Sequence, residues 1–118
     1  MILRTLFRVG GWACLAAIAL LSVVSPGLRP VTNVPHDLEH ALIFALAGYA
    51  LMLGYPGRVL WRLAAVTAFA AAVELVQFFS PGRHPTLRDF AVDAASACAG
   101  VLLAALVIQL WKLRVRRG

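Results

Sequence analysis

The chain has 118 residues, enough for a single domain. Hydrophobic residues make up 62% of it and charged residues 14%, a balance that excludes a water-soluble domain of this length and indicates an integral membrane protein. The formal net charge of +6 does not indicate a nucleic-acid partner, because the basic residues follow a membrane topology rather than one exposed patch.

Four apolar segments approach the roughly 20 residues that are needed to cross a hydrocarbon core. They are residues 6–25, 38–55, 59–79 and 90–111. None alternates polar and apolar residues with period two, so helices rather than barrel strands have to satisfy the backbone in lipid. The sequence therefore predicts an all-α integral membrane protein, one domain over residues 1–118, with four transmembrane helices in an antiparallel bundle. The first segment is expected to remain as a helix, because no A-x-A cleavage pattern precedes Pro26.

Basic residues gather at one set of helix ends. They are Arg4, Arg8, Arg58, Arg62, Lys112, Arg114, Arg116 and Arg117. Only Arg29, Arg83 and Arg88 belong to the other set. The positive-inside rule then predicts that both termini are cytoplasmic, with residues 112–118 forming a basic tail at the inner leaflet. Small residues in the third segment are expected to permit close helix approach, namely Ala64, Ala68 and Ala72.

Polar chemistry gathers at the predicted outer ends. All five acidic residues and all three histidines fall there. A carboxylate at membrane depth costs roughly 2.5–3.5 kcal/mol on insertion scales, so such residues usually face the interior of a bundle and serve a function. Residues three or four apart on a helix share a face, and this spacing recurs in the last three segments. The sequence predicts an outward-facing polar and acidic pocket formed by His36, Asp37, His40, Glu74, Gln77, Arg83, Asp89 and Asp93.

Purely structural roles remain open for several of these residues. Asp89 follows Thr86 by three, which is the spacing of a capping box. Asp37 and Glu39 suit the first turn of a helix, where the dipole favours anions. Glu74 and Gln77 could form interhelical hydrogen bonds, or Glu74 could pair with a loop arginine.

A metal site is a weak alternative. The side chains of His36, His40, Glu74 and Asp93 are chemically able to ligate a metal ion. However, an H-x-x-x-H pair without an intervening glutamate is a weak signal. We therefore expect neither a metal nor a cofactor.

Two stretches of the chain resemble the VanZ-like membrane proteins: HDLEHALIFALAGYAL and ELVQFFSPGRHPTLRDFAVDAASACAG. The family pattern has an Asp and a His opening a helix, then Glu-x-x-Gln, a loop Arg, an Asp starting the last helix, and an Asn or Asp four residues later. Those positions correspond here to Asp37, His40, Glu74, Gln77, Arg83, Asp89 and Asp93. The chain departs from the pattern at Leu38, where the family often has Lys, at Asp93, where Asn is common, and at Ser96, where Gly is common.

The resemblance implies a multi-pass protein of the bacterial cytoplasmic (inner) membrane with a role at the cell envelope, on a lipid or a wall-related molecule. The family takes its name from a protein linked to low-level teicoplanin resistance, a property that the resemblance does not transfer to this chain.

Three functions fit the residues. The first is binding, in which the pocket holds a lipid headgroup or a cell-wall precursor. The second is an intramembrane hydrolase or transferase with Glu74 as acid or base and His40 as its proton partner, although no serine lies in a nucleophile motif. The third is a small proton-coupled transport subunit, for which four helices are few unless the chain forms a homo-oligomer. The bilayer itself is the one partner common to all three.

Overall fold

The computed structural model describes residues 1–23, 33, 35–80, 82, 84 and 86–118, without the side chain of His36. It contains the helices α1 (Ile2–Val23), α2 (His36–Gly54), α3 (Val59–Phe78) and α4 (Leu87–Arg117). All four are long and apolar enough to cross a membrane. The prediction of an all-helical protein with four spans is therefore confirmed.

Local chemistry explains where these helices begin and end. Helix α2 ends at Gly54, and Tyr55 leaves the helical region with φ −128° and ψ 67° because it precedes Pro56. The turn after α3 contains Gly82 at φ 73°, in the left-handed region that glycine tolerates best. Helix α4 opens with Thr86 as its N-cap, whose Oγ1 accepts a hydrogen bond from the backbone N–H of Asp89 at 3.1 Å.

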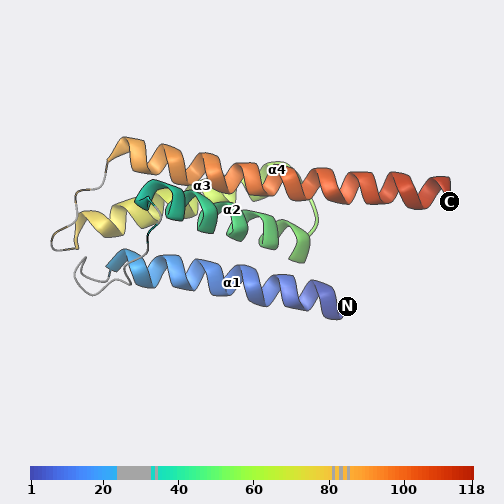
Figure 1. Cartoon of the computed structure of the whole chain (residues 1–118), viewed down its shortest axis with the longest axis horizontal. Helices are drawn as coiled ribbons and strands as arrows, with labels where there is room; N and C mark the ends of the chain where they lie inside the picture. Colours follow the sequence, from blue (N-terminus) through green and yellow to red (C-terminus); the bar gives the residue numbers. More distant parts are fainter. Residues whose placement is uncertain (24–32, 34, 81, 83, 85) are drawn as a thin grey trace.

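The fourth helix is longer than the sequence indicated. It continues to Arg117, through the residues expected to form a basic tail after residue 111. Leucine, lysine and arginine are good helix formers, no proline interrupts them, and cations in the last turn suit the negative end of the helix dipole. Its 31 residues extend about 46 Å at 1.5 Å per residue, which exceeds the core of a bilayer. The last turns of α4 therefore project beyond the other three helices (Figure 1).

Consecutive helices run in opposite directions. The N-terminus, the α2–α3 turn and the C-terminus lie at one end of the molecule, and the starts of α2 and α4 lie toward the other (Figure 1). The antiparallel arrangement and the shared side of the two termini agree with the predicted topology.

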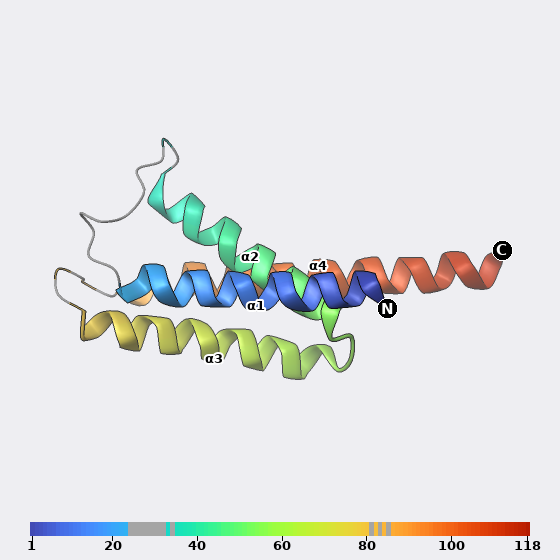
Figure 2. The same cartoon turned by 90° about the horizontal axis from the view of Figure 1, so that it is seen from below.

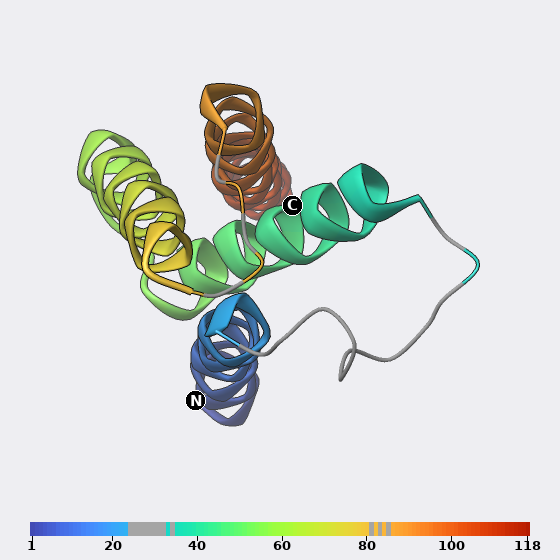
Figure 3. The ribbon, with the colours of Figure 1, turned by 90° about the vertical axis from the view of Figure 1, so that its left-hand side faces the viewer.

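Helix α2 is the centre of the bundle. It packs most extensively against α4 and next against α1, whereas α3 rests mainly on α4. Viewed end-on, α2 lies between α1 and α4 (Figure 3). It is inclined to the other helices, so that its first turns point away from α1 and α3 (Figure 2). The start of α2 contacts the start of α4 through the ion pair of Asp37 and Arg88.

Two glycines allow α2 and α4 to touch through their backbones. A Cβ on Gly48 would meet the carbonyl oxygen of Ala97, and a Cβ on Gly100 would meet the carbonyl oxygen of Ala45. Glycine is thus required on both sides of the crossing, as in other close helix pairs in membranes. The expected role of Ala64, Ala68 and Ala72 is not found, because all three are exposed on α3. They occupy a face of α3 that is turned away from α4.

The packed interior is made of small and medium side chains. Ala70, Val101 and Ala104 are fully buried, and Phe44 is 1% exposed. Large apolar side chains instead cover the outside, such as Leu75 and Phe78 of α3. This inversion fits a helical bundle whose surface is solvated by acyl chains rather than water.

Candidate functional site

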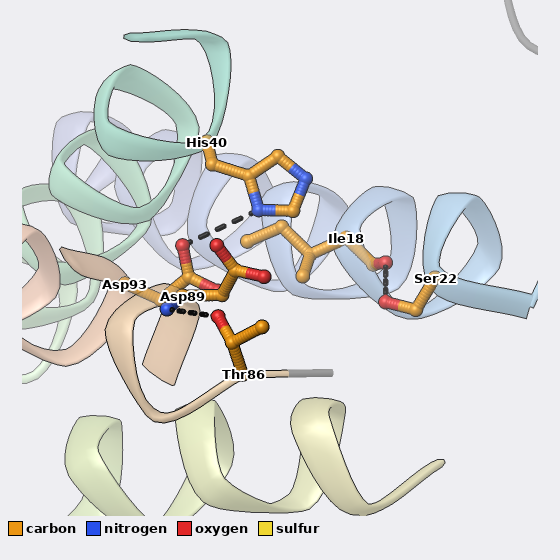
Figure 4. Close-up of polar contacts among 6 residues, drawn as sticks. All are labelled: Ile18, Ser22, His40, Thr86, Asp89 and Asp93. Atoms are coloured by element: carbon orange, nitrogen blue, oxygen red, sulfur yellow. Dashed lines mark hydrogen bonds and ion pairs between the residues drawn. The ribbon is translucent and has the colours of Figure 1, made fainter. Parts of the chain in front are cut away.

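The first two turns of α4 carry two carboxylates on one face. Asp89 lies in the first turn and is half-buried, and Asp93 lies one turn further along and is 1% exposed. Figure 4 shows both carboxylates on the side of α4 that faces His40, with Ile18 of α1 nearby. Thr86 accepts the backbone N–H of Asp89, and this cap does not use the Asp89 carboxylate. The capping-box hypothesis therefore explains the backbone hydrogen bond of Asp89 but gives no role to its carboxylate.

Helix α2 contributes His40. Its Nδ1 lies 3.3 Å from Oδ1 of Asp93, a contact that counts as a hydrogen bond or an ion pair according to the protonation of the ring. The His40 side chain is 20% exposed. Phe44 lies one turn further along α2, and the centres of the His40 and Phe44 rings are 6.2 Å apart. The apolar core begins at Phe44.

Helix α3 supplies the third polar wall. Glu74 is 9% exposed and Gln77 is 6% exposed, and both lie on the face that also carries the buried Ala70. Asp93, Asp89 and His40 are the ionisable groups that lie near the Glu74 carboxyl group. Residues from three helices therefore converge at one end of the bundle. We call Glu74, Asp89, Asp93 and His40 the acidic cluster.

Several carboxylate oxygens of this region lack a hydrogen-bond donor. Within the described part of the chain, neither Oε1 nor Oε2 of Glu74 has a partner, although both are buried, and the same holds for Oδ2 of Asp93. Oε1 of Glu39, at the start of α2, is in the same condition. A buried acceptor without a partner costs about 1–3 kcal/mol. The Glu74 carboxyl group lies close to that of Asp93 across α3 and α4, and no N–H donor of the described residues reaches it.

Asp37 and Arg88 form a separate pair at the rim. Nη2 of Arg88 lies 2.8 Å from Oδ2 of Asp37, with exposed fractions of 78% and 51% for the two side chains. This contact joins the starts of α2 and α4 at the surface. Arg88 is thereby directed to the rim aspartate rather than to Asp93, and Asp37 lies outside the acidic cluster.

The structure does not describe the side chains of two other predicted site residues. Arg83 is outside the described residues, and so is the side chain of His36, although its backbone starts α2. His84, which the sequence placed in the loop, is exposed.

Two polar residues with buried atoms toward this end of the bundle were not among the predicted site residues. Glu39 was read as a helix-start residue, yet one of its oxygens is buried. Ser22 of α1 is 3% exposed, and its Oγ donates to the backbone carbonyl of Ile18 at 2.5 Å (Figure 4). A serine in the last turn of an apolar segment is a weak signal, because such a hydroxyl readily bonds its own helix.

A metal site of three or more His, Cys, Asp or Glu side chains is absent from the described residues. The acidic cluster mainly offers hydrogen-bond acceptors, because most of its polar atoms are carboxylate oxygens. The cluster contains three carboxyl groups and one imidazole, so protons or the N–H and O–H donors of a bound group are needed to satisfy the carboxylate oxygens. The arrangement could hold a ligand rich in donors, or pass a proton between a carboxyl group and His40.

The fold and the cluster together define a small multi-pass helical membrane protein with buried polar chemistry at one end. A family model described as VanZ/LLP1 matches residues 3–109, which is most of the chain. The protein belongs to the VanZ/LLP1 family. Searches of curated proteins and of solved structures found no match to it.

Proposed function

We propose that this VanZ/LLP1 protein binds the polar group of a lipid or of a cell-wall-related molecule at the acidic cluster. In this proposal the chain lies in the bacterial inner membrane with both termini in the cytoplasm, and the cluster opens to the outer side. The bias of basic residues toward the ends that carry the termini supports this orientation.

The observation that carries the proposal is the set of buried oxygens without donors. Among the described residues, Glu74 has two such atoms and Asp93 has one. A ligand that presents ammonium or hydroxyl hydrogens would satisfy them, and charge-assisted bonds of this kind are about twice as strong as neutral ones. The proposed ligand class is therefore a headgroup or sugar rich in N–H and O–H donors. A purely anionic group would be repelled by the carboxylates.

Access from the outer side is consistent with the position of His40. Its side chain is partly exposed, whereas Asp93, which it contacts, is buried. The Asp37–Arg88 pair at the surface adds a positive and a negative group at the rim. Exposed ion pairs contribute little to stability, so this pair can open at low cost.

The direct test is native mass spectrometry of the protein released from its own membrane. We expect the wild type to retain a lipid-sized or precursor-sized adduct, and Glu74→Gln to lose most of it. This substitution keeps the size of the side chain but replaces one acceptor oxygen with a donor. His84→Asn is the matched control, because His84 is an exposed polar residue near the same end of the bundle.

Three results would contradict the binding proposal. The first is that neither the wild type nor Glu74→Gln carries any adduct. The second is that both carry the same adduct in the same proportion. The third is that His84→Asn loses the adduct as completely as Glu74→Gln, which would point to a general effect of surface change.

The contact between His40 and Asp93 favours acid–base catalysis as a second function. An imidazole held by a carboxylate, with Glu74 close by, is an arrangement that can move protons. In that case the mass of the retained adduct would change with time in the wild type and stay constant in His40→Gln.

Transport receives less support from the contacts deeper in the bundle. Thr67 Oγ1 lies 3.4 Å from Cys98 Sγ between α3 and α4. Beyond this contact, Leu63, Ala104 and Ile108 belong to the hydrophobic core between the helices. An ion or proton crossing the bilayer would need polar groups along that stretch.

A further inference from the structure

The end of the molecule that carries both termini contains a second polar arrangement. Arg8 of α1 donates from Nε to the backbone carbonyl of Gly54 at 2.8 Å, and its guanidinium lies 4.7 Å from the centre of the Tyr55 ring. Arg62 of α3 donates from Nε to the backbone carbonyl of Tyr55 at 2.9 Å. Two guanidinium groups from different helices are thus bound to neighbouring carbonyls of one turn.

The aromatic residues fix this turn in place. Nε1 of Trp12 donates to the hydroxyl of Tyr55 at 3.0 Å, which links α1 to the end of α2. Gly54 is buried, and a Cβ there would come within 2.9 Å of both Cγ and the backbone N of Arg8. The absence of a side chain at Gly54 is therefore what lets Arg8 reach the carbonyl. Tryptophan and tyrosine with their polar atoms engaged in this way are typical of the membrane–water interface.

The two guanidinium groups retain unused donors. Each guanidinium has five N–H hydrogens, and the Nε–H is only one of them. In the described part of the chain, no hydrogen bond or ion pair engages the Nη atoms of Arg8 or Arg62. The five acidic residues do not supply a counterion, because they lie toward the opposite ends of α2, α3 and α4.

We infer that Arg8 and Arg62, which flank the turn at Tyr55, bind a phosphate ester, namely the headgroup phosphate of an anionic phospholipid. Each guanidinium is held in place by its Nε–H bond to the turn, and its planar group can offer paired N–H donors to phosphate oxygens. Arg8 is exposed and Arg62 is half-buried, so both can be approached from the bilayer surface. Trp12, 59% exposed, would lie beside the glycerol region of the same lipid.

This site is independent of the acidic cluster. It lies at the other end of the bundle and takes a ligand of opposite charge. Failure of either proposal therefore leaves the other standing.

The test measures lipid affinity by native mass spectrometry in detergent, with phosphatidylglycerol as the probe and phosphatidylcholine as the zwitterionic comparison. We expect the wild type to prefer phosphatidylglycerol, and the double variant Arg8→Ala/Arg62→Ala to bind it about tenfold more weakly or worse, as expected on losing charge-assisted bonds. The matched control is Arg114→Ala/Arg116→Ala, which removes the same charge from exposed positions near the end of α4. We expect this control to lose less than about threefold, since the removed charges lie outside the site.

Two further measurements guard against a folding defect and a wrong ligand source. In Arg8→Lys/Arg62→Lys the charges remain but the paired donors are lost, so phosphatidylglycerol should still bind more weakly than to the wild type. Soluble glycerol 3-phosphate should bind far more weakly than the lipid, because it lacks the chains that place the phosphate at the interface. Equal lipid affinity in the wild type and the lysine variant would overturn the site. So would an equal loss in the Arg114/Arg116 control, and glycerol 3-phosphate binding as tight as that of the lipid would overturn the assignment to a phospholipid.

Discussion

The contact between α2 and α4 gives the most quantitative prediction, because Gly100 allows no side chain. A Cβ at Gly100 would lie 2.9 Å from the carbonyl carbon of Ala45 and from the backbone nitrogen of Tyr49, whereas ordinary contact begins at 3.4 Å. These neighbours are backbone atoms, so no side chain can rotate away. In Gly100→Ala the two helices have to separate by more than about 0.5 Å, because the carbonyl oxygen of Ala45 is closer still to the new Cβ.

The separation has two consequences. Overpacking of a well-packed contact typically costs about 1–3 kcal/mol, which is the expected loss in the free energy of unfolding for Gly100→Ala. The contact between His40 Nδ1 and Asp93 Oδ1 is 3.3 Å, close to the limit for a hydrogen bond, and the same movement would break it. One methyl group at the centre of the crossing should therefore loosen the acidic cluster, which lies about two turns away along α4.

The assay is reversible unfolding in bicelles, followed by helix content, combined with the adduct measurement by native mass spectrometry. Gly10→Ala is the control, because a Cβ at Gly10 meets nothing within 4 Å. That substitution should be neutral or stabilise the helix by up to about 1 kcal/mol, since alanine has the higher helix propensity. If Gly100→Ala proves as stable as Gly10→Ala and keeps its adduct, the inferred backbone contact between α2 and α4 is wrong.

Three more substitutions test single contacts by the same unfolding assay. His40→Ala should cost about 1–3 kcal/mol by leaving the buried Asp93 without its partner, and adding Asp93→Leu should recover part of that loss; a double variant that is less stable than the single one would contradict this. Thr86→Ala should cost about 0.5–2 kcal/mol because the N-cap of α4 is lost, and an unchanged stability would show that this hydrogen bond is not made. Asp37→Asn should change stability by less than about 1 kcal/mol, since its pair with Arg88 is exposed, and a larger loss would place Asp37 inside the cluster.

The sequence predicted the membrane helices closely. Long apolar segments and the cost of unsatisfied backbone in lipid leave few other solutions, so four helices follow from composition and length. The start of α4 was less well located, because Thr86 caps the chain ahead of the apolar run that begins at residue 90. Its end was also missed, because the charged residues after Trp111 end a hydrophobic segment without ending a helix.

The sequence indicated the candidate site through helical spacing. Asp89 and Asp93 share a face of α4, and Glu74 and Gln77 share a face of α3, as their separations require. Their place at one end follows from the alternation of spans. A role in binding remains a prediction for all of them, including Arg83, which lies outside the described residues.

By itself, the sequence determined that the helices lie in lipid, how many spans there are, and at which end of the bundle the acidic residues lie. Each of these depends on hydropathy and helical period along a single chain. Only the tertiary structure decided which acid meets which base: Asp93 contacts His40, whereas Asp37 contacts Arg88. The reason is the angle and depth at which α2 crosses α4, which Gly48 and Gly100 set by letting the two backbones touch. Such a crossing depends on two residues that lie far apart in the sequence, and no local pattern in either helix specifies it.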